Sequence, residues 1–253
     1  MKPPADSFGR GIIHRLKVGV NLRKYSVISD VGKKRTNNQD SYFICDGWCV
    51  VADGMGGHNG GEVASHTAIE IIKKSLMQQS ISVDLLLKNA IENANSELYK
   101  MSQSDPTLEG MGTTMVLCYF DGYEAVIAHV GDSRAYHISP LGLVQITCDH
   151  SIVQQLIESG TITEAEAKNH PQKNLITRAI GTEATIQTDI NRFEFCKDDF
   201  ILLCTDGLTN YVSDSEIEKV VKENDTDTAV RILVDLANSR GGTDNITAVL
   251  IVL

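Results

Sequence analysis

Short apolar runs separated by turn residues dominate the first part of the chain after residue 24. Runs of this length, bounded by glycine or aspartate, are typical of β-strands. The predicted strands are Tyr25–Ser29, Ser41–Cys45 and Trp48–Ala52. After a glycine-rich stretch, apolar residues recur at helical spacing, which predicts helices over about Glu62–Gln78 and Val83–Ser102.

After residue 112, predicted strands again come in groups and predicted helices in pairs. The turn sequence Asp121-Gly122 predicts a hairpin, and Thr163 with Glu166 three residues later predicts a capped helix start. Strands in hairpin groups and helices in pairs predict the α+β fold class with antiparallel sheets. The predicted elements are strands Thr113–Phe120, Ala125–Val130 and Arg134–Ser139, helices Ile152–Ser159 and Thr163–Lys168, strands Ile186–Phe195 and Phe200–Thr205, helices Asp214–Lys222 and Thr226–Asn238, and a last strand Ile246–Leu253.

Composition narrows the class of protein. A chain of 253 residues with 42% hydrophobic and 22% charged residues is typical of one soluble globular domain. No uncharged apolar run approaches the roughly 18 residues that span a bilayer, so we expect no membrane span. The start, MKPPADSFGR, has no apolar signal segment, and we expect a cytoplasmic protein. The net charge of −10 argues against a nucleic-acid partner, which requires a basic surface.

Charge also separates residues 1–22, an N-terminal extension, from a domain predicted over residues 23–253. Residues 1–24 contain six basic residues and one acidic residue. The extension could add an edge strand, contact an acidic partner or be flexible, and the sequence favours none of these. Six cysteines are scattered without a closely spaced pair, which predicts buried thiols in a reducing compartment.

Several aspartates stand beside glycine at the ends of predicted strands. Asp53 and Asp206 follow the apolar runs WCVVA and FILLC, where a carboxylate is costly unless a cation or hydrogen bonds compensate. Oxygen ligands without histidine or cysteine suit Mg²⁺ or Mn²⁺. The alternative is simple turn chemistry, which we expect at Asp46-Gly47 and Asp121-Gly122. The candidate sequences are Asn38-Gln39-Asp40, Asp53-Gly54, Gly131-Asp132-Ser133-Arg134, Thr205-Asp206-Gly207 and Thr243-Asp244-Asn245.

Seven segments in a fixed order resemble the PP2C-type (PPM family) metal-dependent protein serine/threonine phosphatases, most of all the bacterial branch. They are YSVISDVGKKRTNNQDSYF from residue 25, VVADGMGGHNGGEVAS from 50, GMGTT from 110, AHVGDSRAY from 128, TCDHS from 147, LLCTDGLTN from 202 and GGTDNIT from 241. The resemblance implies a central β-sandwich of two antiparallel sheets flanked by helix pairs. It also implies hydrolysis of phosphoserine and phosphothreonine in proteins by a metal-bridging hydroxide, without a covalent intermediate.

The resemblance further implies a binuclear Mn²⁺ or Mg²⁺ centre. Asp53 would bridge the two ions, and the carbonyl oxygen of Gly54 would bind one of them. Asp206 and Asp244 would hold the other ion. Asp40 would support the centre through metal-bound waters.

Two further residues match family positions outside this pair of ions. Asp132, together with Asp206, would bind a third and weaker ion. Arg35 would bind the substrate phosphate, because a guanidinium group can grip two phosphate oxygens at once. The alternative for Arg35 is an exposed arginine in a turn.

The sequence departs from the common family pattern at a few positions. Gln39 stands where the family commonly has Glu, so one negative charge is lost and the affinity for one metal could weaken. Met55 fits the bacterial pattern, so we leave His58 as a polar loop residue rather than a general acid. His150 is interpreted as a structural or near-site residue. His66, in a predicted helix, and His129 and His137, in predicted strands, are expected to be ordinary core or surface residues.

Residues 151–181 resemble the bacterial flap subdomain, which could gate the substrate or act as a lid without selectivity. The expected partners are phosphorylated proteins, the substrates of a bacterial serine/threonine kinase, and we expect a monomer. The alternative function is a catalytically silent regulatory or binding module of the same fold. The presence of Asp53, Asp206 and Asp244 favours the enzyme.

Overall fold

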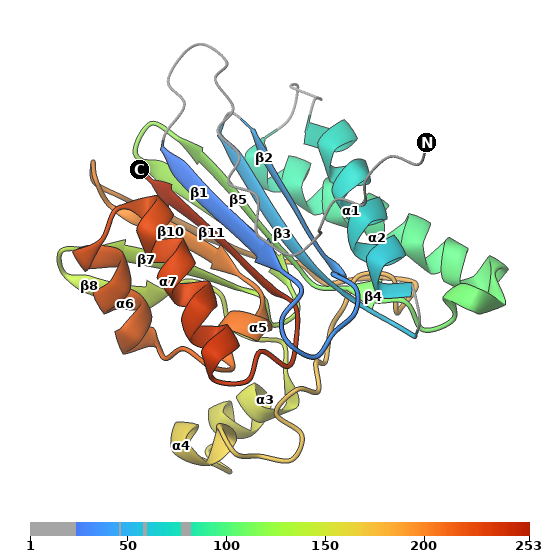
Figure 1. The fold of residues 1–253 in the computed structure, drawn as a ribbon. Coiled ribbons are helices and arrows are strands. Elements are labelled where there is room, and N and C mark those ends of the chain that lie inside the picture. Colours follow the sequence, from blue (N-terminus) through green and yellow to red (C-terminus); the bar gives the residue numbers. More distant parts are fainter. Residues whose placement is uncertain (1–23, 46, 58–59, 77–81) are drawn as a thin grey trace, which may run out of the picture.

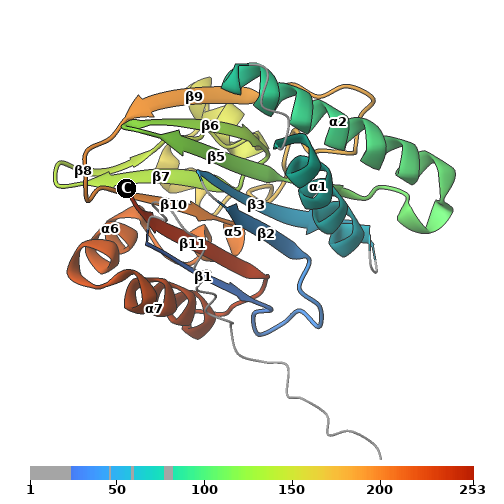
Figure 2. The same cartoon turned by 90° about the horizontal axis from the view of Figure 1, so that it is seen from above.

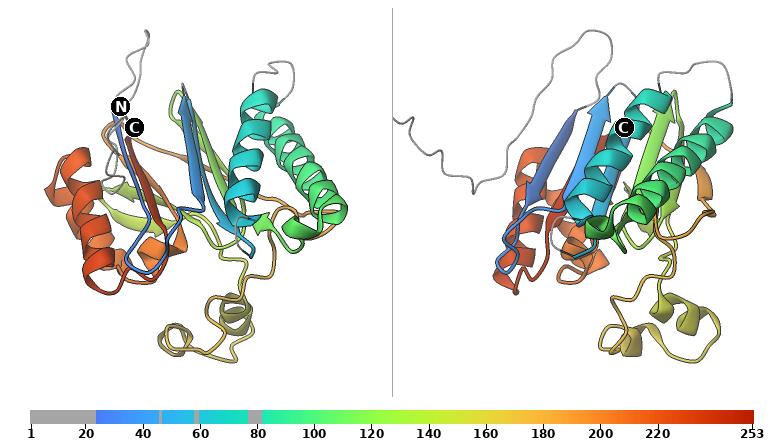
Figure 3. Two further views of the ribbon diagram at one scale, coloured as in Figure 1. Left: turned by 45° about the vertical axis from the view of Figure 1, so that its right-hand side comes forward. Right: turned by 90° about the vertical axis from the view of Figure 1, so that its right-hand side faces the viewer.

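Two antiparallel β-sheets pack face to face, and a pair of helices covers the outer face of each (Figures 1 and 3). This computed structural model describes residues 24–45, 47–57, 60–76 and 82–253. The N-terminal extension and His58 lie outside the described residues. The arrangement confirms the predicted α+β sandwich.

The first sheet has the strand order β1-β11-β10-β7-β8. Helices α6 and α7 cover its outer face, as the view from above shows (Figure 2). The chain thus places its first and last described strands side by side. The strands are β1 (Tyr25–Asp30), β7 (Arg134–Ser139), β8 (Gly142–Gln145), β10 (Phe200–Cys204) and β11 (Ile246–Val252), and the helices are α6 (Asp214–Glu223) and α7 (Thr226–Ser239).

The second sheet has the order β2-β3-β5-β6-β9, and the short strand β4 pairs with β3. Helices α1 and α2 cover its outer face (Figure 2). The strands are β2 (Asp40–Cys45), β3 (Trp48–Met55), β4 (Gly112–Thr113), β5 (Met115–Asp121), β6 (Glu124–Val130) and β9 (Asp189–Glu194), and the helices are α1 (Gly60–Leu76) and α2 (Val83–Ser104).

The inner strands are buried on both faces, which explains their continuous apolar runs. In β3, Val50 and Ala52 pack toward the helices, whereas Cys49 and Val51 pack toward the other sheet. Successive side chains of a strand point to opposite faces, so a strand between two packed layers needs apolar residues at every position. The core therefore has three layers, one between the sheets and one under each helix pair.

Helices α3 (Ile152–Glu158) and α4 (Glu164–Ala167) project from one end of the sandwich (Figures 1 and 3). The predicted cap is present: Thr163 and Glu166 form a capping box at the start of α4. Ser151 caps α3, and Gly160, with φ of 70°, follows its end. Among the described residues, no helix combines the length and apolar character needed to cross a bilayer.

Two sequence-based expectations need correction. Cys45, Cys148 and Cys196 are exposed, so only half of the cysteines are buried. The strand expected over Ile186–Phe195 is shorter and begins only at Asp189. The structure also contains a 3₁₀ turn (Pro106–Leu108), the short helix α5 (Asp206–Thr209) and strands β4 and β8, which the pattern did not indicate.

Candidate metal centre

Asp40 and Asp53 lie opposite each other as cross-strand partners at one end of the β2–β3 hairpin. The backbone of Asp53 is fixed by the GMGTT segment. The Thr114 N–H donates to the Asp53 carbonyl oxygen (2.8 Å), and the Asp53 N–H donates to Thr114 Oγ1 (3.1 Å). Thr113 Oγ1 adds a hydrogen bond to the same carbonyl oxygen (2.9 Å). This end of the second sheet therefore holds two carboxyl groups on a rigid backbone.

The glycines after Asp53 allow helix α1 to start against the backbone of β3. A Cβ atom on Gly54 would lie 2.0 Å from the carbonyl oxygen of Gly61. The Gly54 N–H donates to the Gln39 carbonyl oxygen (3.1 Å). Gln39 is buried beside the same helix start, because a Cβ on Gly61 would lie 2.9 Å from its side-chain Cδ.

Asp206 and Asp244 come from the other sheet. Asp206 begins α5 directly after β10, and its Oδ2 accepts a hydrogen bond from Asn210 Nδ2 (2.9 Å). Asp244 precedes β11. Their two loops touch, because a Cβ on Gly207 would lie 1.9 Å from the carbonyl oxygen of Asn245.

Asp132 lies in the turn between β6 and β7. Gly131, with φ of 103°, allows this turn to pass close to Thr114. Ser133 Oγ and Thr114 Oγ1 are 2.7 Å apart, so the turn is tied to the segment that holds Asp53. Burial raises the pKa of Asp53, and charge repulsion from Asp132 is among the smaller contributions, which places Asp132 in the same cluster.

Burial and mutual repulsion disfavour the ionised form of the clustered carboxyl groups. Burial raises the pKa of Asp53 well above its usual range, and repulsion from Asp40 and Asp206 adds to the effect. Burial raises the pKa values of three more carboxyl groups for the same reasons, that of Asp206 to about 6, that of Asp40 to about 7 and that of Asp132 to about 8. Buried anions at this spacing favour protonation or a bound cation.

The residues present fit a site for divalent cations. Among the described residues, Oδ1 of Asp40 and Oδ1 of Asp206 are buried without a hydrogen-bond partner. Leaving a buried acceptor unpaired is costly, whereas a cation would satisfy it. The carboxylate oxygens form a hard, oxygen-only donor set of the kind that Mg²⁺ and Mn²⁺ prefer.

Arg35 lies at the edge of this cluster. Its guanidinium Nη2 donates to Asp244 Oδ2 (2.9 Å), and 47% of its side chain is exposed. Asn245 holds the loop that carries Arg35, because its Nδ2 donates to the carbonyl oxygens of Val31 (3.0 Å) and Asn37 (2.9 Å). The structure therefore brings all seven candidate residues to one end of the sandwich.

Two of the histidines form a separate group at the base of the flap. His150 Nδ1 accepts a hydrogen bond from the Gly131 N–H (3.1 Å), so its Nε2 carries the proton and faces Asp189 Oδ2 (3.2 Å). Arg178 pairs with Asp189 Oδ1 (2.8 Å). His129 stacks on His150, with ring centroids 4.6 Å apart. His129, His150 and Asp189 are close enough to share a cation, but the Arg178 charge already balances Asp189.

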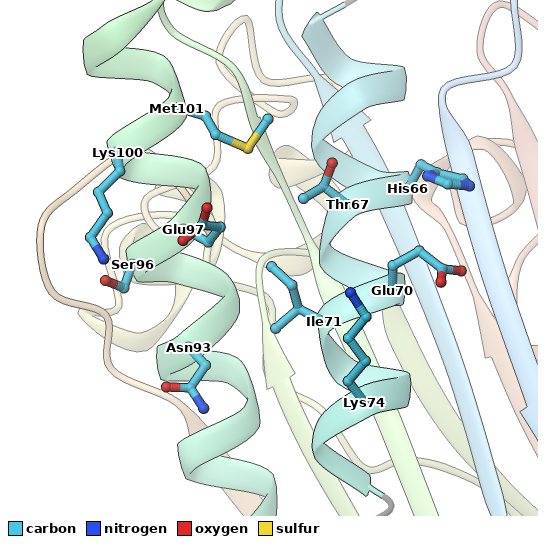
Figure 4. A pocket seen from close by; sticks show the side chains of 10 residues that line it. All are labelled: His66, Thr67, Glu70, Ile71, Lys74, Asn93, Ser96, Glu97, Lys100 and Met101. Carbon is cyan, nitrogen blue, oxygen red and sulfur yellow. The ribbon is translucent and has the colours of Figure 1, made fainter.

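A hollow of about 570 Å³ lies between α1 and α2 (Figure 4). Both signs of charge line it: Glu70 and Lys74 come from α1, and Glu97 and Lys100 come from α2. None of the seven candidate residues lines it. The mixed charge points to no class of ligand, and we assign the hollow no role.

Known proteins resemble this chain in sequence and in fold. The family model "Protein phosphatase 2C" matches residues 32–250. The serine/threonine phosphatase stp of Listeria monocytogenes is 37% identical over 234 residues, which are 88% of this chain and 93% of the relative. The structure of the Mycobacterium tuberculosis phosphatase PstP/Ppp superimposes with a TM-score of 0.86 at 36% identity, covering 91% of this chain and 98% of that one. The catalytic domain of PstP, solved with two manganese ions, has a TM-score of 0.83 at 35% identity, covering 90% and 97%.

Proposed function

The chain belongs to the protein phosphatase 2C family and is a metal-dependent protein serine/threonine phosphatase, and we propose that the clustered aspartates hold its metal ions. In this proposal Asp53 bridges two ions, and the Gly54 carbonyl oxygen binds one of them. Asp206 and Asp244 bind the other. Asp40 would support the centre through waters bound to the ions.

One observation carries the assignment of these residues. Carboxyl groups from both sheets meet at one end of the sandwich, buried and with raised pKa values. A protein stabilises such a group of like charges with a cation far more readily than with hydrogen bonds alone. The unpartnered buried oxygens of Asp40 and Asp206 support the same assignment.

The chemistry follows from this charge distribution. When bound, divalent cations neutralise the phosphate dianion and lower the pKa of a bound water toward neutrality. We propose that Arg35, at the exposed edge of the cluster, grips the phosphate oxygens and orients the ester. We propose that Asp132 contributes, with Asp206, to a third and weaker ion.

The finer identity of metal, substrate and partner is also part of the proposal. The manganese ions in the related PstP structure support Mn²⁺ as one metal that the site accepts, with Mg²⁺ as the alternative. We propose phosphoproteins made by a bacterial serine/threonine kinase as substrates, and a monomer as the active form. The scattered cysteines favour a reducing compartment, the cytoplasm.

We place the phosphatase domain at residues 23–253 and treat residues 1–22 as an extension to it. Residues 151–181 form the flap, which we propose gates the substrate. Its helices stand beyond the end of the sandwich (Figure 3), and its base, at Arg178 and Asp189, is tied to the sheet beside the Asp132 turn.

The test is hydrolysis of a phosphothreonine peptide by the full chain, first with EDTA and then with added Mn²⁺ or Mg²⁺. We expect turnover only with metal, and a loss of about 100-fold or more in kcat for Asp206→Asn, which removes a ligand charge. Asp121→Asn, at the exposed end of β5 and with no place in the cluster, is the matched control and keeps wild-type activity. A folded wild-type protein that is inactive with every metal would instead support the silent regulatory module, and Gln39→Glu would be the first reversion to try.

A further inference from the structure

The two carboxylate oxygens of Asp40 have different surroundings. Oδ2 accepts hydrogen bonds from the hydroxyl groups of Thr205 (3.0 Å) and Thr247 (2.7 Å). Both threonines have an exposed fraction of 0%, so their hydroxyl groups are shielded from bulk water. Oδ1 has no hydrogen-bond partner in the described part of the chain and is left to the carboxylate cluster. We call the two hydroxyl groups on Oδ2 the hydroxyl clamp.

The other contacts of the hydroxyl clamp fix the direction of each hydrogen bond. Thr205 Oγ1 already accepts from the Thr247 N–H (3.0 Å), so its single proton is available for Asp40. Thr247 Oγ1 lies 2.7 Å from Ser29 Oγ, which accepts from Asn38 Nδ2 (2.8 Å). Ser29 therefore donates to Thr247, and Thr247 donates to Asp40. Every donor in this chain of hydroxyl groups points toward Oδ2.

The hydroxyl clamp also joins the two sheets. Asp40 starts β2 in one sheet, whereas Thr205 follows β10 and Thr247 lies in β11 of the other. Asp53 is the cross-strand partner of Asp40, and Asp206 follows Thr205 directly in sequence. The clamp thus lies between the two halves of the donor set, one from each sheet.

We propose that Thr205 and Thr247 are positioning residues whose hydroxyl groups fix the Asp40 carboxylate, and with it the spacing of the two donor halves, for binding of the divalent cations. This inference rests on the proposed function, because it takes Asp53 and Asp206 as metal ligands. Groups that orient a metal's ligands raise affinity because the site needs less reorganisation on binding. Loss of a hydroxyl group removes no metal ligand. It removes only a hydrogen bond that orients the Asp40 carboxylate.

The experiment separates the hydroxyl group from the shape of the side chain. Thr247→Val keeps the shape and removes the hydroxyl, whereas Thr247→Ser keeps the hydroxyl and removes a methyl group. Thr205→Val and Thr205→Ser repeat the comparison. If the valine and serine variants at either position fold, they show whether the hydroxyl group or the packing of the side chain matters. Thr226→Val is the matched control: Thr226 is also buried, at 2% exposed, but its hydroxyl has no hydrogen-bond partner among the described residues.

The readout is the affinity of the metal-free full chain for Mn²⁺, measured by titration calorimetry, with melting in EDTA to verify folding. We expect the valine variants to bind Mn²⁺ about tenfold more weakly, since each loses a hydrogen bond to a charged group. We expect the serine variants to stay within about threefold of wild type, and Thr226→Val to be unchanged. At saturating Mn²⁺ the KM for a phosphothreonine peptide should stay constant, because Arg35 is untouched.

Two results would overturn the inference. Folded valine variants with wild-type affinity for Mn²⁺ would show that the hydroxyl groups do not position the site. Serine variants as weak as the valine variants would show that the threonines act through packing of their methyl groups. A wild-type protein that binds no Mn²⁺, or binds it as tightly after Asp206→Asn, would instead refute the proposed function itself.

Discussion

Gly54 is a residue at which the centre has no room for a side chain. A Cβ there would lie 2.0 Å from the Gly61 carbonyl oxygen and 2.6 Å from the Gln39 carbonyl oxygen, and both are backbone atoms that cannot rotate away. We therefore predict that Gly54→Ala lowers the free energy of unfolding by about 3 kcal/mol or more, because α1 must separate from β3. Urea unfolding of the metal-free protein measures this.

Gly57→Ala is the control for that substitution. Among the described residues, a Cβ on Gly57 would meet nothing within 4 Å, so we expect a change of less than about 0.5 kcal/mol. Equal stability of Gly54→Ala and wild type would contradict the close contact between helix and strand.

Two aspartates of the centre stand out in the sequence by themselves, whereas the threonine and asparagine side chains that hold the centre together do not. Asp53 and Asp206 stand out because a carboxylate directly after an apolar strand needs a reason to be there. Thr247 is an ordinary strand residue by pattern, and its partner Asp40 is 207 positions away. Asn245, which fastens the loop carrying Arg35, shows the same limit, since its bonds depend on the folded approach of β1 and β11.

At the scale of elements, the flap is attached by its base and extends away from the centre. The Ile152 N–H donates to the Leu175 carbonyl oxygen (2.9 Å), and the Thr177 N–H donates to the His150 carbonyl oxygen (2.7 Å). These two hydrogen bonds join the two ends of the flap, and neither involves an aspartate of the proposed metal centre. The part of the flap beyond the base is therefore open to replacement.

We predict that replacing residues 159–173 with a glycine-serine linker of equal length separates small from large substrates. The value of kcat/KM for a small aryl phosphate should stay within about threefold, because the base of the flap and the cluster remain. The value for a phosphothreonine peptide should fall about tenfold or more, if the flap contacts the peptide as a gate. Parallel assays of both substrates measure this. An equal effect on the two would support a lid without selectivity.

Element boundaries followed the hydrophobic pattern where elements are long, and failed where they are short. Helices α6 and α7 have capped starts and clear apolar stripes, so their ends agree with prediction to within about one residue. Strand β8 has four residues, none of them buried, and exists because Ser139 and Gly142 close a hairpin onto β7. A short edge strand of this kind is specified by its neighbour rather than by its own pattern.

At the scale of the whole molecule, the sandwich brings like charges together at the meeting of its sheets. The grouping of strands and helices predicts antiparallel sheets, and the family resemblance implies that two of them form a sandwich. The sequence does not predict which strand ends meet. Strands β1 and β11, the first and the last of the described strands, are neighbours in the sheet, and nothing in the local pattern of either strand indicates this pairing. The aspartates of the cluster, which lie between Asp40 and Asp244 in the sequence, therefore come together through the topology of the fold. From the sequence, only the resemblance to a known family indicates that they do so.

This convergence predicts a pH dependence of stability that metal should remove. The folded pKa values of Asp206, Asp40 and Asp132 are raised to about 6, about 7 and about 8, above the unfolded value near 4. A raised pKa contributes stability that is complete below the unfolded pKa and is lost as pH rises through the folded one. In EDTA, Tm should therefore fall by roughly 5–10 °C between about pH 5 and pH 8. Mn²⁺ should flatten the curve, and Asp132→Asn should make it shallower without metal, since one titrating group is gone. Calorimetry of the metal-free protein measures this. A Tm that rises between about pH 5 and pH 8 would show that burial and mutual repulsion do not raise the pKa values of these carboxyl groups in the folded state.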